Sequence, residues 1–336
     1  MTTLERFALA PGLNVCRILN GMWQVSGTHG RIEREKALAG MDAHIDAGFT
    51  TWDLADYYGP AEDLVGELRR RYTTKRGEPA LTGLQFCTKW VPRPGPMPPA
   101  VVEAAIGTSR RRMATQTLDL LQFHWWDYAD RRYLDALAHL TDLRNAGAIR
   151  HLALTNFDTE HLAGILDHKI RIVSNQVQFS LIDRRPEIRM APFCQERGIH
   201  LLAYGTVCGG LLSERHLGQP EPRASTLDTA SLQKYKRMVD AWGGWRLFQE
   251  LLAALNDVAA RHAVSIATVA VRWVLDRPAV AGAILGRRLG LTDHRADNTR
   301  VFAIRLSAED HALIESVLAK SRDLFGLIGD CGDEYR

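Results

Sequence analysis

Short apolar runs alternate with helix-like stretches along nearly the whole chain, and this alternation constrains the fold more than any other feature. The runs predict eight strands: Arg17–Gly21, Phe49–Asp53, Leu84–Lys89, Leu118–His124, Leu152–Thr155, Val173–Gln176, Ile199–Tyr204 and Ala281–Leu285. Helical patterns that stop near glycine or proline lie between several of them: Glu33–Ala47, Arg131–Asn145, Pro186–Arg197 and Ser265–Leu275. Nearly continuous apolar strands are typical of a parallel sheet covered on both faces.

Eight such units in 336 residues favour one α/β domain over residues 1–336, a closed (β/α)8 TIM barrel. A doubly wound open sheet is the alternative, although no G-x-G-x-x-G follows the first strand. Residues 7–15 surround a Pro-Gly turn and predict a β-hairpin that caps one end of the barrel. Residues 213–245, after the seventh strand, are polar and contain several glycines, so we expect a long loop that acts as a lid or binding element.

Composition mainly excludes classes of function. The 42 basic and 39 acidic residues nearly balance, so no nucleic-acid partner is implied. Five cysteines without a C-x-x-C motif favour a reduced, cytoplasmic protein. The first residues lack the apolar core of a signal peptide, and no apolar run reaches the roughly 20 residues of a membrane span. No H-E-x-x-H or H-x-H is present, and no metal site is predicted.

Polar residues fall at the ends of three consecutive predicted strands. Asp53 ends the second strand, Lys89 the third and His124 the fourth, at intervals of 36 and 35 residues. In a (β/α)8 barrel the carboxyl ends of the strands share one mouth, where enzymes of this architecture hold their active sites. Tyr58 follows Asp53 by five residues. We therefore expect all four side chains to lie at that mouth.

These four residue types can carry out proton transfer. The ordinary pKa of tyrosine is about 10, and the Lys89 ammonium would favour the phenolate and lower the pKa of Tyr58. Asp53 would hold that ammonium, and His124 could orient a substrate oxygen. The cluster could then protonate an oxygen that gains negative charge in the transition state. Taken singly, each residue also fits a structural role as a strand cap, an ion-pair partner or a packed ring.

Three segments together resemble the aldo-keto reductase family, over roughly residues 15–315. Trp52–Gly59 resembles the family's stretch with the catalytic aspartate and tyrosine, Phe86–Lys89 is similar to its lysine strand, and Asp119–Asp127 is similar to its histidine strand. The resemblance implies that NADPH reduces a carbonyl, with Tyr58 as general acid and with Asp53, Lys89 and His124 as its catalytic partners.

The resemblance also implies cofactor contacts at later strand ends and loops. The expected contacts are Thr155, Asn156, Gln176 and Tyr204 at the nicotinamide, Gly209, Gly210 and Leu211 at the pyrophosphate, and Gly286, Arg288, His294 and Asn298 at the adenosine half. The guanidinium of Arg288 suits a 2′-phosphate and favours NADP over NAD. Its neighbour Arg287 could be solvated. Gly205-Thr206-Val207 departs from the family's Ser-Pro-Leu, so the pyrophosphate loop could lie differently.

Trp23, Trp90 and Trp125, with Trp126 beside them, could form an aromatic wall that suits a hydrophobic aldehyde or ketone and could also stack on a sugar, or each ring could instead pack in the core. The leading hypothesis is an NADP-dependent oxidoreductase that acts on a small-molecule carbonyl or alcohol. The alternatives are a regulatory subunit that binds the cofactor without useful turnover, and a metal-dependent hydrolase on the same barrel. Residues 323–336 match no motif and could close over the site or pack outside it.

Overall fold

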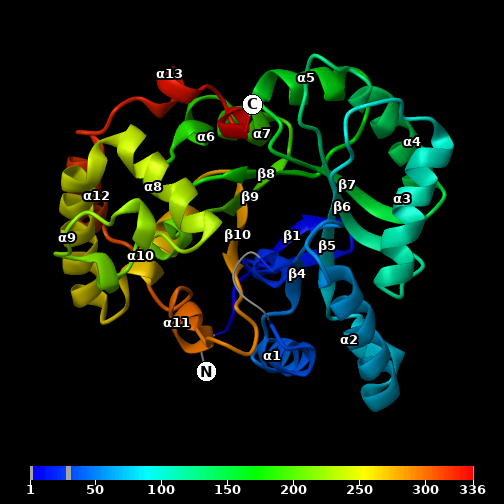
Figure 1. The fold of residues 1–336 in the computed structure, drawn as a ribbon, viewed down its shortest axis with the longest axis horizontal. Helices are drawn as coiled ribbons and strands as arrows, with labels where there is room; N and C mark the ends of the chain where they lie inside the picture. Colours follow the sequence, from blue (N-terminus) through cyan, green and yellow to red (C-terminus); the bar gives the residue numbers. More distant parts are fainter. Residues whose placement is uncertain (1–2, 28–31, 336) are drawn as a thin grey trace.

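The computed structural model describes residues 3–27 and 32–335 and contains a closed barrel of parallel strands (Figure 1). The strand order is β10-β3-β4-β5-β6-β7-β8-β9, and β10 pairs with both β3 and β9 to close the ring. The barrel strands are β3 (Ile18–Gly21), β4 (Thr51–Asp53), β5 (Gln85–Trp90), β6 (Leu118–His124), β7 (Ile149–Thr155), β8 (Ser174–Gln178), β9 (His200–Tyr204) and β10 (Val280–Gly286). The predicted barrel is confirmed, and the open sheet is wrong.

Helices surround the barrel and bury their apolar faces against its outer surface (Figure 1). The helices are α1 (Arg34–Asp46), α2 (Ala61–Arg76), α3 (Pro99–Arg112), α4 (Tyr133–Asn145), α5 (Thr159–Asp167), α6 (Arg185–Ile188), α7 (Met190–Glu196), α8 (Ala230–Trp242), α9 (Gly244–His262), α10 (Ile266–Leu275), α11 (Arg295–Arg300), α12 (Ala308–Leu318) and α13 (Leu324–Ile328). The predicted helix over 186–197 is divided at Arg189, whose backbone leaves the helical region between α6 and α7.

A hairpin of β1 (Arg6–Ala10) and β2 (Leu13–Cys16) closes the amino-terminal end of the barrel, as predicted. Its side chains Leu9 and Leu13 are buried in one cluster with Leu120 and Ala281 from the barrel interior. The cluster fills that end of the barrel with apolar side chains. The opposite end, where the strands finish, is left for polar residues.

The predicted long loop over 213–245 is only partly correct, because its second half is helical. Thr229 caps α8 by accepting a hydrogen bond from the Leu232 amide at 3.2 Å. The buried residues Tyr235, Val239 and Trp242 recur at helical spacing along α8. This apolar stripe outweighs the polar composition of the segment. Gly244, at φ 81°, then allows the turn from α8 into α9.

Two findings concern the whole described chain. Within residues 3–27 and 32–335 no single helix is long and apolar enough to cross a bilayer, although α9 and α10, which meet at a 92° bend, would pass on length and composition if taken together. The five cysteines are all free thiols and all buried.

Candidate active site

The carboxyl ends of the strands bring the predicted polar residues to one mouth of the barrel. Asp53 is the last residue of β4, and His124 is the last residue of β6. His124 lies opposite Thr155 of β7, which lies opposite Gln176 of β8. Tyr204 ends β9 opposite Gln178, two residues beyond Gln176. Parallel pairing thus sets residues that are far apart in sequence side by side around one rim.

Asp53 and Lys89 form an ion pair at the centre of this mouth. Lys89 Nζ donates to Asp53 Oδ2 at 2.6 Å and to the Leu54 carbonyl at 3.2 Å. The side chain of Lys89 is 2% exposed and that of Asp53 is 4% exposed. A buried charge is tolerated only when it is paired and hydrogen-bonded, and both conditions hold here.

Two glutamine amides complete the shell of Asp53. Gln122 Nε2 and Gln176 Nε2 donate to Asp53 Oδ1 at 2.8 and 2.7 Å, and Gln176 also donates to Gln122 Oε1 at 2.7 Å. The sequence predicted a site role for Gln176 but not for Gln122. The missed signal is the period of two in β6, because Gln122 and His124 share a face of that strand.

Tyr58 lies next to this ion pair. Lys89 Nζ is 5.3 Å from the centroid of the Tyr58 ring, and the Trp23 ring packs against it at 5.0 Å. The expectation that the pKa of Tyr58 is lowered is wrong. Burial, together with the charge of Asp53, raises the pKa of Tyr58 above its ordinary value. A raised pKa keeps the Tyr58 hydroxyl protonated at neutral pH.

The loop that carries Tyr58 is held by contacts with β5 and α3. The Asp56 amide donates to the Lys89 carbonyl at 3.0 Å, and Arg112 donates to the Asp56 carbonyl at 3.1 Å. Thr88 donates to the buried carboxylate of Glu62 at 2.8 Å, at the start of α2. Burial raises the pKa of Asp56 to about 6. These contacts fix the position of Tyr58 relative to the strand that bears Lys89.

The aromatic residues divide between the mouth and the core. Trp126 is 38% exposed and packs on His124 with ring centroids 4.3 Å apart. Trp125 is fully buried, and its indole donates to the Asp127 carbonyl at 2.7 Å. The expectation that Trp125 lines a substrate pocket is therefore wrong. Trp90 is also buried, against Phe123, so Trp23 and Trp126 are the tryptophans best placed at the mouth.

The residues expected at a nicotinamide ring lie together at the carboxyl ends of β7, β8 and β9. Asn156 has φ 57°, a left-handed backbone that asparagine tolerates better than most residues. Its Oδ1 is 2.9 Å from the Tyr204 hydroxyl. Thr155 Oγ1 is buried without a hydrogen-bond partner among the described residues. A buried hydroxyl of this kind fits a site for a polar ligand.

The residues expected at the phosphates and the adenosine include both exposed and buried ones. Gly209 and Gly210 have φ of 66° and 102°, whereas Leu211 is buried and its amide already donates to the Cys208 carbonyl at 3.1 Å. The Gly210 amide likewise donates to the Val207 carbonyl at 2.9 Å, and Gly210 differs in having open space where a side chain would lie. Gly286 at the end of β10 is exposed, as are Arg288 and His294 beyond it, and buried Asn298 Nδ2 lacks a hydrogen-bond partner among the described residues.

Arg287 is not the solvated neighbour that its sequence position suggested. It is buried, donates to Asn20 Oδ1 at 2.8 Å and lies 5.8 Å from the Phe49 ring centroid. Burial lowers the pKa of Arg287 to about 10. Of the two arginines after β10, Arg288 is thus the one accessible to a ligand.

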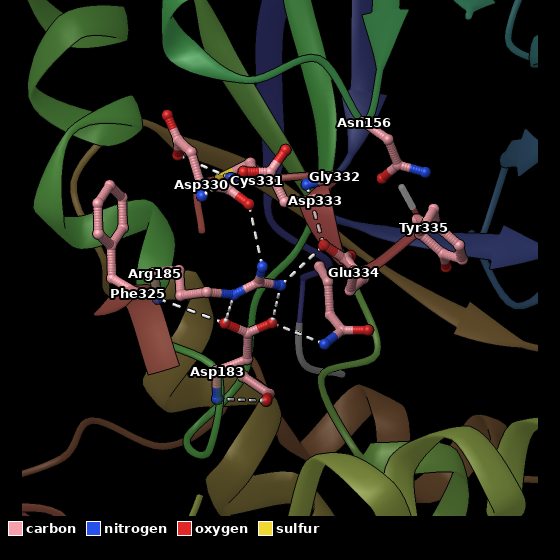
Figure 2. A network of polar contacts seen from close by, with 12 residues as sticks. Asn156, Asp183, Arg185, Phe325, Asp330, Cys331, Gly332, Asp333, Glu334 and Tyr335 are labelled. Carbon is pink, nitrogen blue, oxygen red and sulfur yellow. Dashed lines mark hydrogen bonds and ion pairs between the residues drawn. The ribbon is translucent and has the colours of Figure 1, made fainter. Parts of the chain in front are cut away.

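The carboxy-terminal residues also reach the mouth, which the sequence left open. Figure 2 shows Tyr335 beside Asn156 and Glu334 beside Arg185. Tyr335 packs edge to face on Trp126 at 5.7 Å, and its hydroxyl is 3.2 Å from that of Tyr204. No local pattern could have predicted this contact, because Tyr335 lies 131 residues from Tyr204.

Comparisons with known proteins agree with this geometry. The Bacillus subtilis (strain 168) aldo-keto reductase YhdN is 27% identical over 292 residues, which is 82% of this chain and 82% of that protein. Flagellar radial spoke protein 5 of Chlamydomonas reinhardtii is 27% identical over 257 residues, or 66% of this chain, and the match spans 49% of that longer protein. The structure of glycerol dehydrogenase AKR11B4 from Gluconobacter oxydans shares the fold, with a TM-score of 0.73 at 23% identity over 95% of each chain.

A family model matches most of the chain as well. The model described as the aldo/keto reductase family covers residues 17–319, which include all eight barrel strands and the ion pair of Asp53 and Lys89. The chain therefore belongs to the aldo/keto reductase family of oxidoreductases.

Proposed function

We propose that the chain, as one barrel domain over residues 1–336, uses NADPH to reduce an aldehyde or ketone to an alcohol, or runs the reverse reaction, with Tyr58 as the group that moves the proton. The observation that carries this proposal is the neighbourhood of Tyr58. Its hydroxyl is kept protonated by burial and by Asp53, and a paired ammonium lies 5.3 Å from its ring.

Each residue has a distinct part in the proposed reaction. Reduction needs a hydride at the carbonyl carbon and a proton at the oxygen. When bound, the reduced nicotinamide supplies the hydride. Tyr58 donates its hydroxyl proton to the oxygen as negative charge develops there. Lys89 stabilises the resulting phenolate, Asp53 holds Lys89, and His124 orients the oxygen.

The cofactor site is proposed from fit. Thr155, Asn156 and Gln176 offer amide and hydroxyl groups that match a carboxamide, and Tyr204 offers a ring for stacking. Buried Thr155 Oγ1 and Asn298 Nδ2 lack partners among the described residues, as expected of groups that a ligand completes. Gly209, Gly210 and Gly286 allow close approach of phosphate and adenosine, with His294 at the rim. Exposed Arg288 would bind the 2′-phosphate and favour NADP over NAD.

The test begins with binding and turnover of the intact chain. NADPH should bind more tightly than NADH, and NADPH should be oxidised in the presence of a panel of aldehydes and ketones. Tyr58→Phe should lower kcat by about 10²–10⁴-fold, because the general acid is lost, while the Kd of NADPH stays within a factor of two. The change removes one oxygen and keeps the ring.

Three outcomes would contradict the proposal in different ways. Equal turnover by Tyr58→Phe and the parent would remove Tyr58 from the mechanism. Tight NADPH binding without turnover of any carbonyl would favour the regulatory subunit. Binding of neither nucleotide would refute the cofactor assignment itself.

A further inference from the structure

The last residues that the structure describes, Asp330–Tyr335, fold back against the barrel mouth, and we call them the terminal segment (Figure 2). Gly329, at φ 107°, makes the turn that begins the terminal segment. The Asp330 amide donates to Asp333 Oδ2 at 2.7 Å, so the terminal segment is closed on itself. Cys331 is buried within it.

Arg185 holds the terminal segment in place through hydrogen bonds. Its guanidinium donates to both oxygens of Asp183 at 2.8 Å, to the Asp330 carbonyl at 3.0 Å and to Glu334 Oε2 at 2.9 Å. The side chains of Arg185, Asp183 and Glu334 are 1%, 0% and 4% exposed. Arg185 therefore uses its fixed fork of donors to join a loop after β8 to the end of the chain.

From this anchor the terminal segment reaches residues proposed for the nicotinamide. The Tyr204 hydroxyl is 3.2 Å from Glu334 Oε1 and 3.2 Å from the Tyr335 hydroxyl, besides its contact with Asn156. Lys234 of α8 hydrogen-bonds to the Tyr335 hydroxyl, and its ammonium lies 5.1 Å from the centroid of the Tyr204 ring. The terminal segment and its partner Lys234 thus occupy both the hydroxyl and the ring surroundings of Tyr204.

We propose that the terminal segment is an internal competitor for the nicotinamide half of the cofactor site, so that the cofactor binds fully only when the terminal segment is released. This inference rests on the proposed function. The terminal segment contacts the Tyr204 hydroxyl, and Tyr335 lies beside Asn156 (Figure 2), so a nicotinamide placed against Tyr204 and Asn156 would compete with the terminal segment for the same space. The apparent affinity for NADPH is then the intrinsic affinity multiplied by the fraction of chains whose segment is open.

The experiment compares two ligands on two versions of the chain. The chain that ends at Gly329 lacks the terminal segment, and Leu327→Ala is the control, because Leu327 is 59% exposed on the preceding helix. Calorimetry measures the Kd of NADPH and of adenosine 2′,5′-bisphosphate, which carries no nicotinamide. Truncation should lower the Kd of NADPH at least about tenfold and leave that of the bisphosphate unchanged. The control should change neither.

A second variant covers the case in which the truncated chain does not fold. Tyr335→Ala removes a half-exposed ring at the end of the chain and leaves the anchor at Arg185 in place. It should lower the Kd of NADPH at least about threefold, again without effect on the bisphosphate.

The contrary outcomes separate this inference from the proposed function. If NADPH binds equally well with and without the terminal segment while the KM of the carbonyl changes, the terminal segment is a wall of the substrate pocket, and competition is refuted. If the affinity for NADPH falls on truncation, the terminal segment is part of the cofactor site, and competition is refuted in this case as well. If neither ligand binds any version, the proposed function fails and the inference fails with it.

Discussion

The ion pair of Asp53 and Lys89 and the ion pair of Asp183 and Arg185 are almost equally withdrawn from water, with no side chain more than 4% exposed. Each aspartate also accepts a hydrogen bond from a glutamine of a barrel strand, Gln122 or Gln178. The two ion pairs differ in the residue that supplies the positive charge and in the side chain next to that residue. Lysine can release a proton when its surroundings change, whereas arginine stays charged. Beyond Lys89 lies Tyr58, and beyond Arg185 lies a second carboxylate, Glu334.

This difference shows that burial and pairing alone do not identify a chemical centre. For Arg185, burial favours a lower pKa, but the hydrogen bonds and charges of Asp183 and Glu334 outweigh it and raise the pKa further above its ordinary value. That pair can only hold parts of the chain together. At Lys89, the neighbour is the ring of Tyr58 at the mouth of the barrel, and in the proposed reaction the same kind of pair serves proton transfer.

The largest expected effect comes from Lys89→Met, which removes the cation next to Tyr58. Carbonyl reduction should fall by about 10²–10⁴-fold, measured as kcat with saturating NADPH. The free energy of unfolding should also fall, by about 3–5 kcal/mol, because Asp53 is left buried and unpaired. Asp53→Asn in addition to Lys89→Met removes that stranded charge and should regain stability but not activity. Recovery of activity in the double variant would make the pair structural.

Arg185→Met should have an effect of similar size on stability but little effect on chemistry. It strands the carboxylates of Asp183 and Glu334, at a cost of about 3–5 kcal/mol in the free energy of unfolding by urea. At saturating NADPH and carbonyl, kcat should stay within about twofold of the parent. A hundredfold lower kcat in a folded variant would show that the pair of Asp183 and Arg185 affects the reaction and is not merely structural.

The smallest expected effect uses the two glutamines as matched variants. Gln122→Leu and Gln178→Leu each remove one hydrogen bond to a buried aspartate and should each cost about 1–3 kcal/mol of unfolding free energy. Only Gln122→Leu should lower kcat, by about tenfold, with a weaker affinity for NADPH through Gln176. Equal kcat in the two variants would reduce Gln122 to a structural role.

Most of the barrel could be predicted because strand and helix periods are local. The mouth could also be anticipated, since strand ends spaced one βα unit apart must meet in a closed parallel barrel. Helix α8 was missed because its buried residues Tyr235, Val239 and Trp242 are diluted by a polar surface. Trp125 was placed at the mouth in error, although alternation beyond His124 already indicates that Trp126 returns to the mouth and Trp125 does not.

Contacts between distant residues could not be predicted in this way. Arg287 lies 267 positions from Asn20, and Arg185 lies 149 positions from Glu334. Nothing in either arginine's local sequence tells a buried guanidinium from a solvated one. The predicted direction of the pKa shift of Tyr58 is wrong for a related reason. The shift depends on how deeply the ring is buried and not only on which charges are near.

The hairpin of β1 and β2 has a consequence for how ligands reach the site. Because Leu9 and Leu13 pack with barrel residues in one apolar cluster at the amino-terminal end of the barrel, we expect ligands to reach Tyr58 from the opposite end. When two ligands bind at the same end of the barrel, the ligand that binds deeper has to bind first and dissociate last. We therefore expect a compulsory order of exchange at this mouth, imposed by two leucines far from any reacting atom.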